Sequence, residues 1–138
     1  FILAHANYSP MSEKIKYEME FPIQASSALL YQYISTPSGM QEWYADNVNS
    51  RGEIFNFIWE GSEEVAKLIS KQKGKSIRFQ WMEDEGTNYY FEMRIDLDDI
   101  TKDVCIMVTD FAEEDEVDEG KMLWENMISE LKHLLGSV

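Results

Sequence analysis

The apolar residues of one long segment near the C-terminus fall on a single helical face. At about 100° per residue, the apolar positions between 118 and 136 gather into one arc. The arc consists of Leu123, Trp124, Met127, Ile128, Leu131, Leu134 and Leu135. Four acidic residues between 115 and 119 stand where carboxylates favour a helix N-terminus, and Gly136 follows as a stop signal. The pattern predicts a helix over residues 118–136 with one buried face.

Most of the remaining chain alternates between apolar and polar residues, which is the pattern of β-strands with one buried face. Residues 15–23 alternate in this way, with Ile15, Tyr17, Met19, Phe21 and Ile23 on the apolar side. The pattern returns, between turns rich in Gly, Asp or Lys, at residues 54–60, 63–70, 77–81, 89–97 and 102–111, with a weaker candidate at 45–49. These segments predict six or seven antiparallel strands, most of them joined by hairpins.

Two short helices are predicted between the first strand and the later ones. Ser26 or Ser27 can cap a helix over residues 28–35, residues 36–39 interrupt it at Pro37, and residues 40–44 can form a second short helix. A strongly curved sheet needs an apolar element on its concave side, and only the C-terminal helix is long and apolar enough. The predicted fold class is therefore α+β: a curved antiparallel sheet wrapped around a long C-terminal helix.

Composition and charge narrow the possible functions. The 138 residues include 12 Lys and Arg against 26 Asp and Glu, so the net charge is −14. This charge repels a phosphate backbone, which argues against nucleic-acid binding, and it leaves open a basic protein partner. No apolar run approaches the roughly 20 residues that span a bilayer, so we expect no stable membrane insertion. Cys105 is the only cysteine, which fits a reducing cytoplasmic location.

The first ten residues differ from the rest of the chain. They lack an initiator, whereas Met11-Ser12-Glu13 resembles an ordinary bacterial start. Their apolar stretch is short and has no basic residues before it, which is unlike a complete signal peptide, although a remnant of one is an alternative. We expect residues 1–10 to be an upstream extension, a misassigned start or residues added for expression, and residues 11–138 to form one domain.

The order of elements resembles the helix-grip fold of the START-like (SRPBCC) superfamily, which includes Bet v 1-like plant proteins, polyketide cyclases and activator-of-Hsp90-ATPase-like proteins. The local cues are Phe21-Pro22-Ile23, the helical segment at 26–31, the Pro-containing break at 36–39 and Trp43 at the end of the second helix. The resemblance covers residues 11–136 and is nearest to small acidic START-like proteins of Bacteroidetes. It implies a deep, mostly apolar cavity between sheet and terminal helix that takes a hydrophobic small molecule or lipid.

Large aromatic and thioether side chains supply the candidate ligand-binding residues. The candidates are Tyr33, Trp43, Tyr44, Phe57, Trp59, Phe79, Trp81, Tyr89, Phe91, Met93, Arg94, Met107, Trp124 and Met127. Tyr33, Tyr44, Gln80 and Arg94 could orient a ligand through polar groups, although a cross-strand ion pair is an alternative role for Arg94. Mutual packing in a closed core is the alternative for the apolar candidates.

No residue pattern indicates a catalytic, metal or cofactor site. His5 lies in the predicted extension, His133 lies on the polar face of the last helix, and Cys105 has no CxxC partner. The acidic run at 113–119 lacks the ligand spacing of an EF-hand, and no glycine-rich phosphate loop is present. We therefore expect no metal, no cofactor and no catalytic residue.

The primary hypothesis is non-covalent binding of a hydrophobic small molecule or lipid between the sheet and the C-terminal helix. One alternative is a protein-interaction module, which would meet a basic partner or a second copy of the chain. The other is a polyketide-cyclase-like enzyme, which needs a titratable group with a shifted pKa facing the cavity. The sequence offers no evident inward-facing group of this kind, so an enzyme is the less favoured reading.

Overall fold

A curved sheet of seven antiparallel strands organises residues 13–137, the part of the chain that the structure, a computed structural model, describes. The predicted extension at 1–10 lies outside these residues. The strands are β1 (Lys14–Ile23), β2 (Asn47–Arg51), β3 (Ile54–Trp59), β4 (Ser62–Gln72), β5 (Ser76–Trp81), β6 (Phe91–Leu97) and β7 (Val104–Glu113). Their order in the sheet is β1-β7-β6-β5-β4-β3-β2. Strands β2 to β7 therefore form a meander, and β1 adds to its last strand.

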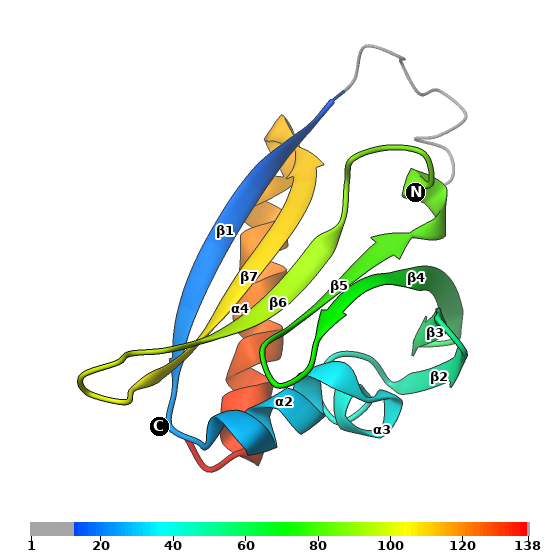
Figure 1. The fold of residues 1–138 in the computed structure, drawn as a ribbon. Coiled ribbons are helices and arrows are strands. Elements are labelled where there is room, and N and C mark those ends of the chain that lie inside the picture. The colour runs from blue at the N-terminus through cyan, green and yellow to red at the C-terminus, as the bar shows by residue number, and fades with distance from the viewer. Residues whose placement is uncertain (1–12, 138) are drawn as a thin grey trace.

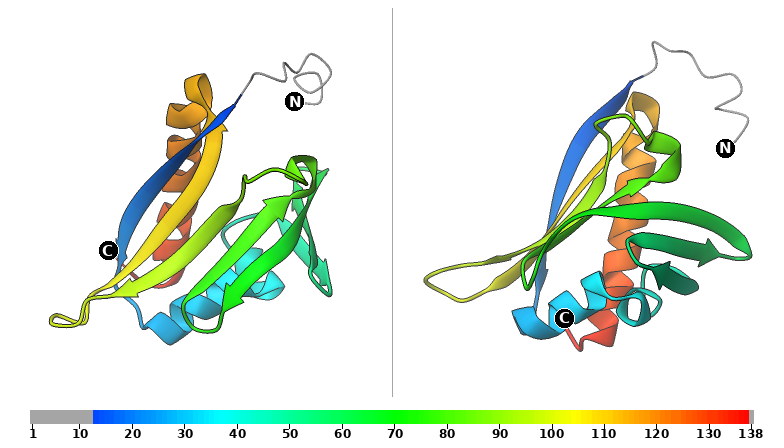
Figure 2. Two further views of the ribbon diagram at one scale, coloured as in Figure 1. Left: turned by 45° about the horizontal axis from the view of Figure 1, so that its top comes forward. Right: turned by 45° about the vertical axis from the view of Figure 1, so that its right-hand side comes forward.

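Helices fill and close the concave side of this sheet. Helix α4 (Val117–Leu134) follows a 3-10 turn, η2 (Glu114–Glu116), and lies across the concave face beside β1 and β7 (Figure 1). Helices α2 (Ser27–Ser35) and α3 (Pro37–Met40) close one end of the sheet, as both views in Figure 2 show. The predicted α+β helix-grip architecture is confirmed.

The pairing of β1 with β7 brings the two ends of the fold together. Ten residue pairs, from Lys14 opposite Glu113 to Ile23 opposite Val104, join the strands. Apolar residues at alternate positions of β6 and β7, such as Met93 and Ile106, are fully buried on the face that α4 covers. The same alternation in the sequence predicts this inner face, but Met107 of β7, a candidate cavity residue, lies on the opposite face.

The second short helix begins earlier than predicted. Thr36 caps it, because its hydroxyl oxygen accepts a 3.0 Å hydrogen bond from the Gly39 N–H, and Pro37 is the first helical residue. Proline is favoured there, since its missing N–H would have no partner in the first turn anyway. The predicted break after α2 therefore lies at the extended Thr36, Pro37 starts α3, and residues 41–44, predicted as helical, form turns.

The buried face of α4 is narrower than its apolar face. Trp124, Ile128 and Leu131 are buried, but Leu134 is 41% exposed and Leu123 is 59% exposed. The predicted buried face is therefore only partly buried, because Leu123 and Leu134 are exposed and Met127 and Leu135 are half-buried. The helix packs mainly against β1 and β7, and Leu123 faces the open space between α4 and the other strands.

Two leucines of α4 provide a matched test of this packing. Leu131 is fully buried and Leu134 is 41% exposed, so Leu131→Ala should cost about 2–5 kcal/mol in the free energy of unfolding. Leu134→Ala should cost less than about 1 kcal/mol. Urea unfolding of both variants measures the difference, and equal losses would contradict the described position of α4.

Candidate ligand-binding cavity

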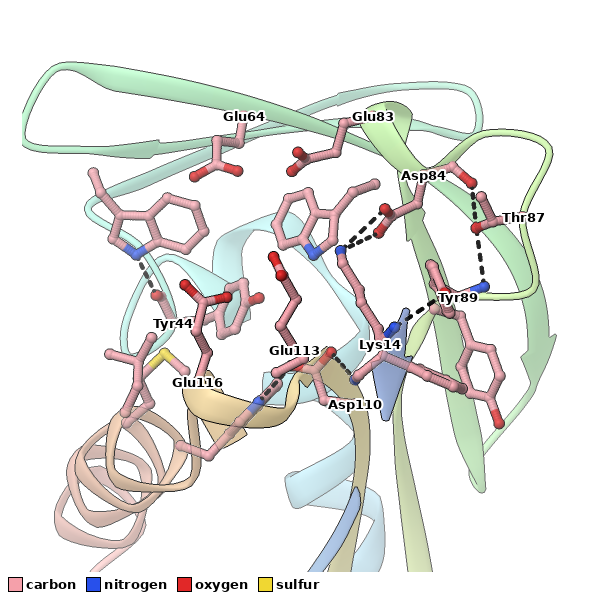
Figure 3. Close-up of a pocket in the computed structure, with 18 residues that line it drawn as sticks. Lys14, Tyr44, Glu64, Glu83, Asp84, Thr87, Tyr89, Asp110, Glu113 and Glu116 are labelled. Carbon is pink, nitrogen blue, oxygen red and sulfur yellow. Dashed lines mark hydrogen bonds and ion pairs between the residues drawn. The ribbon is translucent and has the colours of Figure 1, made fainter. Parts of the chain in front are cut away.

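A cavity of about 910 Å³ lies between the N-terminal half of α4 and the strongly curved part of the sheet. Its walls come from β1, β3, β4, β5, the end of β7, η1 (Met82–Asp84), η2 and α4 (Figure 3). Pockets that hold small molecules usually measure about 300–1,000 Å³. The cavity is therefore large enough for a small organic ligand.

Aromatic rings form much of the inner wall, and hydrogen bonds hold several of them in place. The ring centroid of Tyr44 lies 5.5 Å from that of Trp59 and 5.7 Å from that of Trp124. The indole N–H of Trp59 donates to the Tyr44 carbonyl oxygen at 2.8 Å. The indole N–H of Trp124 donates to a carboxylate oxygen of Asp110 at 2.9 Å. The rings therefore present fixed faces to the cavity.

Of the fourteen candidate residues predicted from the sequence, six line the cavity. They are Tyr44, Trp59, Trp81, Tyr89, Trp124 and Met127. Four others are fully buried in the adjoining core, namely Phe57, Phe79, Phe91 and Met93. These four pack against one another and against the cavity wall, as the closed-core alternative anticipated; for example, the Phe79 and Phe91 ring centroids are 5.2 Å apart.

The other four candidates, and Gln80, do not line the cavity. Arg94 lies on the outer face of β6, where it bonds Asp96 at 3.2 Å, and Met107 is its register partner on β7. The indole N–H of Trp43 donates to the Tyr33 carbonyl oxygen at 2.8 Å, which joins α2 to the turns after α3.

The side-chain amide of Gln80 donates to the Tyr89 carbonyl oxygen at 2.8 Å and to that of Thr87 at 3.1 Å. It therefore anchors the loop before β6. Strand alternation explains why Arg94 and Met107 lie on the outer face, because each stands one residue out of step with the inward-facing Met93 and Ile106.

Asp110 is the main cavity residue that the sequence interpretation missed. It continues the inward alternation of Val104, Ile106 and Val108 on β7, so the strand pattern itself could have identified it. Burial raises the pKa of Asp110 to about 6, while the N–H groups of Trp124 and Phe111 oppose this rise. A carboxyl that titrates near neutrality can accept or donate a proton. The expectation that no inward titratable group exists was therefore wrong.

A glycine in α4 makes room for a tyrosine beside Asp110. Gly120 faces Tyr17 of β1, and a Cβ at position 120 would lie 2.5 Å from the Tyr17 hydroxyl oxygen. Burial and the nearby Asp110 carboxylate raise the pKa of Tyr17, and they raise the pKa of Tyr44 in the same way. Both phenols therefore remain neutral and can act as hydrogen-bond donors near the cavity floor.

Acidic side chains surround the opening. The carboxylates of Glu64, Glu83, Glu113 and Glu116 point toward the space above Tyr44 (Figure 3). Within residues 13–137, no group of His, Cys, Asp or Glu is arranged to hold a metal ion. The carboxylates therefore come from several sides rather than forming one chelating cluster.

Lys14 connects three of the segments that line one side of the cavity. Its ammonium group lies 3.1 Å from a carboxylate oxygen of Asp84 in η1, and its backbone N–H donates to the Tyr89 hydroxyl oxygen at 3.1 Å. These contacts join the start of β1 to η1 and to the loop before β6, two segments that do not pair with β1. The charge of Lys14 is therefore paired with that of Asp84, the buried carboxylate of η1.

The family follows from a comparison of the sequence with family models. The model that describes the START-like superfamily domain matches residues 11–137. The chain belongs to this START-like superfamily. Within residues 13–137 no helix is long and apolar enough to cross a membrane, and a comparison with curated proteins found no significant match.

The same fold occurs in several solved structures, one of which is also similar in sequence. BfR322 from Bacteroides fragilis is 34% identical, with 90% of this chain and 92% of that chain covered and a TM-score of 0.64. The Aha1 dimer from Colwellia psychrerythraea is 17% identical, with 88% and 96% covered and a TM-score of 0.74. CalU16 from Micromonospora echinospora is 12% identical, with 91% and 77% covered and a TM-score of 0.68. The resemblance to the START-like superfamily is confirmed, and a protein from Bacteroides is among the similar structures.

The Asp110 carboxyl gives a testable pH dependence. The unfolded chain releases this proton near pH 3.8 and the folded chain near pH 6, so ionisation between these values favours unfolding. Relative to Asp110→Asn, the wild type should therefore lose ~3 kcal/mol of stability as the pH rises through this range, at about 1.36 kcal/mol per pKa unit. Urea unfolding at several pH values measures the difference, and NMR of the Asp110 carboxyl carbon gives its pKa directly. Parallel stability curves would contradict the burial of this group.

Proposed function

We propose that this START-like domain binds a hydrophobic small molecule or lipid non-covalently in the cavity between its sheet and α4. The observation that carries the proposal is the aromatic cavity of about 910 Å³ beside a core that is otherwise closely packed. Affinity would come from burying the apolar part of the ligand against the rings, at roughly 25 cal/mol per Å² of apolar surface. Orientation would come from the few polar groups at the floor and rim.

Native mass spectrometry of the purified protein tests this proposal first. A bound molecule at about one per chain, identified after denaturing extraction, would support it and reveal the chemical class of the ligand. Uptake of a fluorescent apolar probe by the emptied protein is the complementary measurement. A protein that carries nothing and takes up no probe would contradict the proposal.

A cavity-filling substitution localises the binding. Ala112 lines the cavity from β7, so Ala112→Trp should weaken uptake of the apolar probe at least about tenfold, because the indole occupies ligand space. Ala28 is exposed on α2, and Ala28→Trp adds the same side chain away from the cavity. Circular dichroism establishes that both variants fold. Equal uptake by both variants would contradict binding at this site.

Self-association is a second candidate function, favoured by two neighbouring exposed side chains. Met122 is 61% exposed and Leu123 is 59% exposed on α4, and one structural neighbour was solved as a dimer. On this alternative the protein forms a dimer at micromolar concentration, and Met122→Gln weakens it without changing the fold. Light scattering after size-exclusion chromatography measures the mass, and a monomer at every concentration removes this candidate.

A further inference from the structure

We propose that the cavity selects a small organic cation, a molecule with an ammonium or guanidinium group attached to an apolar or aromatic body. The inference rests on the proposed function, because it names the class of ligand for the same cavity. Two independent features carry it, the aromatic faces of the inner wall and the charge of the side chains that line the cavity.

The aromatic wall has the composition and geometry of a site for a cation. Tyr44, Trp59, Trp81 and Trp124 line one continuous space, with the Trp59 and Trp81 ring centroids 6.3 Å apart. The face of an aromatic ring carries negative charge density and attracts cations, and tryptophan does so most strongly. Several rings around one space can contact a single ammonium group together, as in the cages that bind quaternary ammonium ligands.

Basic side chains of the protein already pack on rings next to the cavity. The guanidinium carbon of Arg78 lies 3.9 Å from the centroid of the Tyr90 ring. The Lys14 ammonium lies 5.4 Å from the centroid of the Tyr89 ring. Both tyrosines line the cavity, so cations are stabilised by aromatic faces at its margin within the protein itself.

The charge of the lining favours the same class of ligand. Among the described residues that line the cavity, six are Asp or Glu and Lys14 is the single basic one. The Lys14 ammonium contacts Asp84, which leaves Glu64, Glu116 and Asp110 to determine much of the remaining potential. A fatty acid or another anion would meet these carboxylates as like charges, whereas a cation would be attracted to them.

The arrangement of the carboxylates fits an organic cation better than a metal ion. Glu64 comes from β4 and Glu116 from η2, on different sides of the opening, while Asp110 lies deeper on β7 (Figure 3). A divalent metal needs several oxygen ligands at about 2.0–2.6 Å from one point, and residues 13–137 contain no group that could provide them. An extended molecule can place its charge among the carboxylates and its apolar body against the rings.

Three probes with one ring system and different charges test the inference. They are 1-naphthylmethylamine, which is a cation at pH 7, neutral 1-naphthalenemethanol and anionic 1-naphthoate. Isothermal titration calorimetry, with quenching of tryptophan fluorescence as a second readout, gives each affinity. The cation should bind at least about fivefold more tightly than the alcohol, the anion should bind more weakly than either, and added NaCl should reduce the preference for the cation.

Charge-matched variants show whether the preference arises in the cavity. The pair Glu64→Gln and Glu116→Gln should reduce the preference for the cation over the alcohol at least about threefold. The pair Glu42→Gln and Glu130→Gln removes the same charge from exposed positions outside the cavity lining and should leave the preference unchanged. An equal effect of both pairs, or binding of the cation that does not saturate, would show a general attraction to the acidic surface and overturn the inference.

The remaining outcomes separate this inference from the proposed function. If the alcohol binds as tightly as the amine, and Ala112→Trp weakens both, the cavity binds small molecules but does not select cations, so only the inference fails. If no probe binds, including the fluorescent apolar probe, the proposed function fails as well. If a short lysine- and arginine-containing peptide binds more tightly than the amine and competes with it, the ligand is a protein segment, and the small-molecule inference is overturned.

Discussion

The hydrogen bond from the Trp124 indole to the Asp110 carboxylate connects the two elements that define the cavity. It joins α4 to the end of β7 at a length of 2.9 Å, and it fixes which face of the indole ring is turned toward the cavity. It also gives the buried Asp110 carboxylate a charge-assisted partner, which is needed because an unpartnered carboxylate would be far more costly to bury. Helix position, ring orientation and the protonation of Asp110 therefore depend on the same contact.

Helix α4 covers only part of the curved sheet. The covered part forms the closely packed core, and the uncovered part forms the cavity. Toward the C-terminal half of α4, Leu131 is fully buried, whereas Leu123 near the other end is largely exposed and lines the cavity. The apolar surface left uncovered there does not contribute its full burial energy to folding. Together with the acidic groups that line the same space, this uncovered surface is a local departure from the most stable arrangement, which is typical of functional sites.

Alternation and helical periodicity were enough to predict the strands, α4 and the overall architecture, because one face of each element is buried. The site was harder to predict, for reasons that particular residues illustrate. The long polar side chain of Arg94 suggests a ligand contact, but its place between Met93 and Ile95 directs it outward. The charge of Asp110 suggests an exposed position, but its place two residues after Val108 directs it inward. Glu64 and Glu116 line one cavity only because the sheet curves, which a two-residue period does not encode.

The wall and the rim of the cavity require different things of a ligand. Met127 and the tryptophan faces favour an apolar ligand body, as the family resemblance implied. The carboxylates around them repel an anion, and a neutral hydrocarbon would leave these carboxylates without a partner of opposite charge. In the free protein these like charges repel one another across the opening. A cation joined to an apolar body can pair its charge with the carboxylates of the rim while its apolar part packs on the rings of the wall. Because it would bind the folded state alone, it would also stabilise that state by mass action.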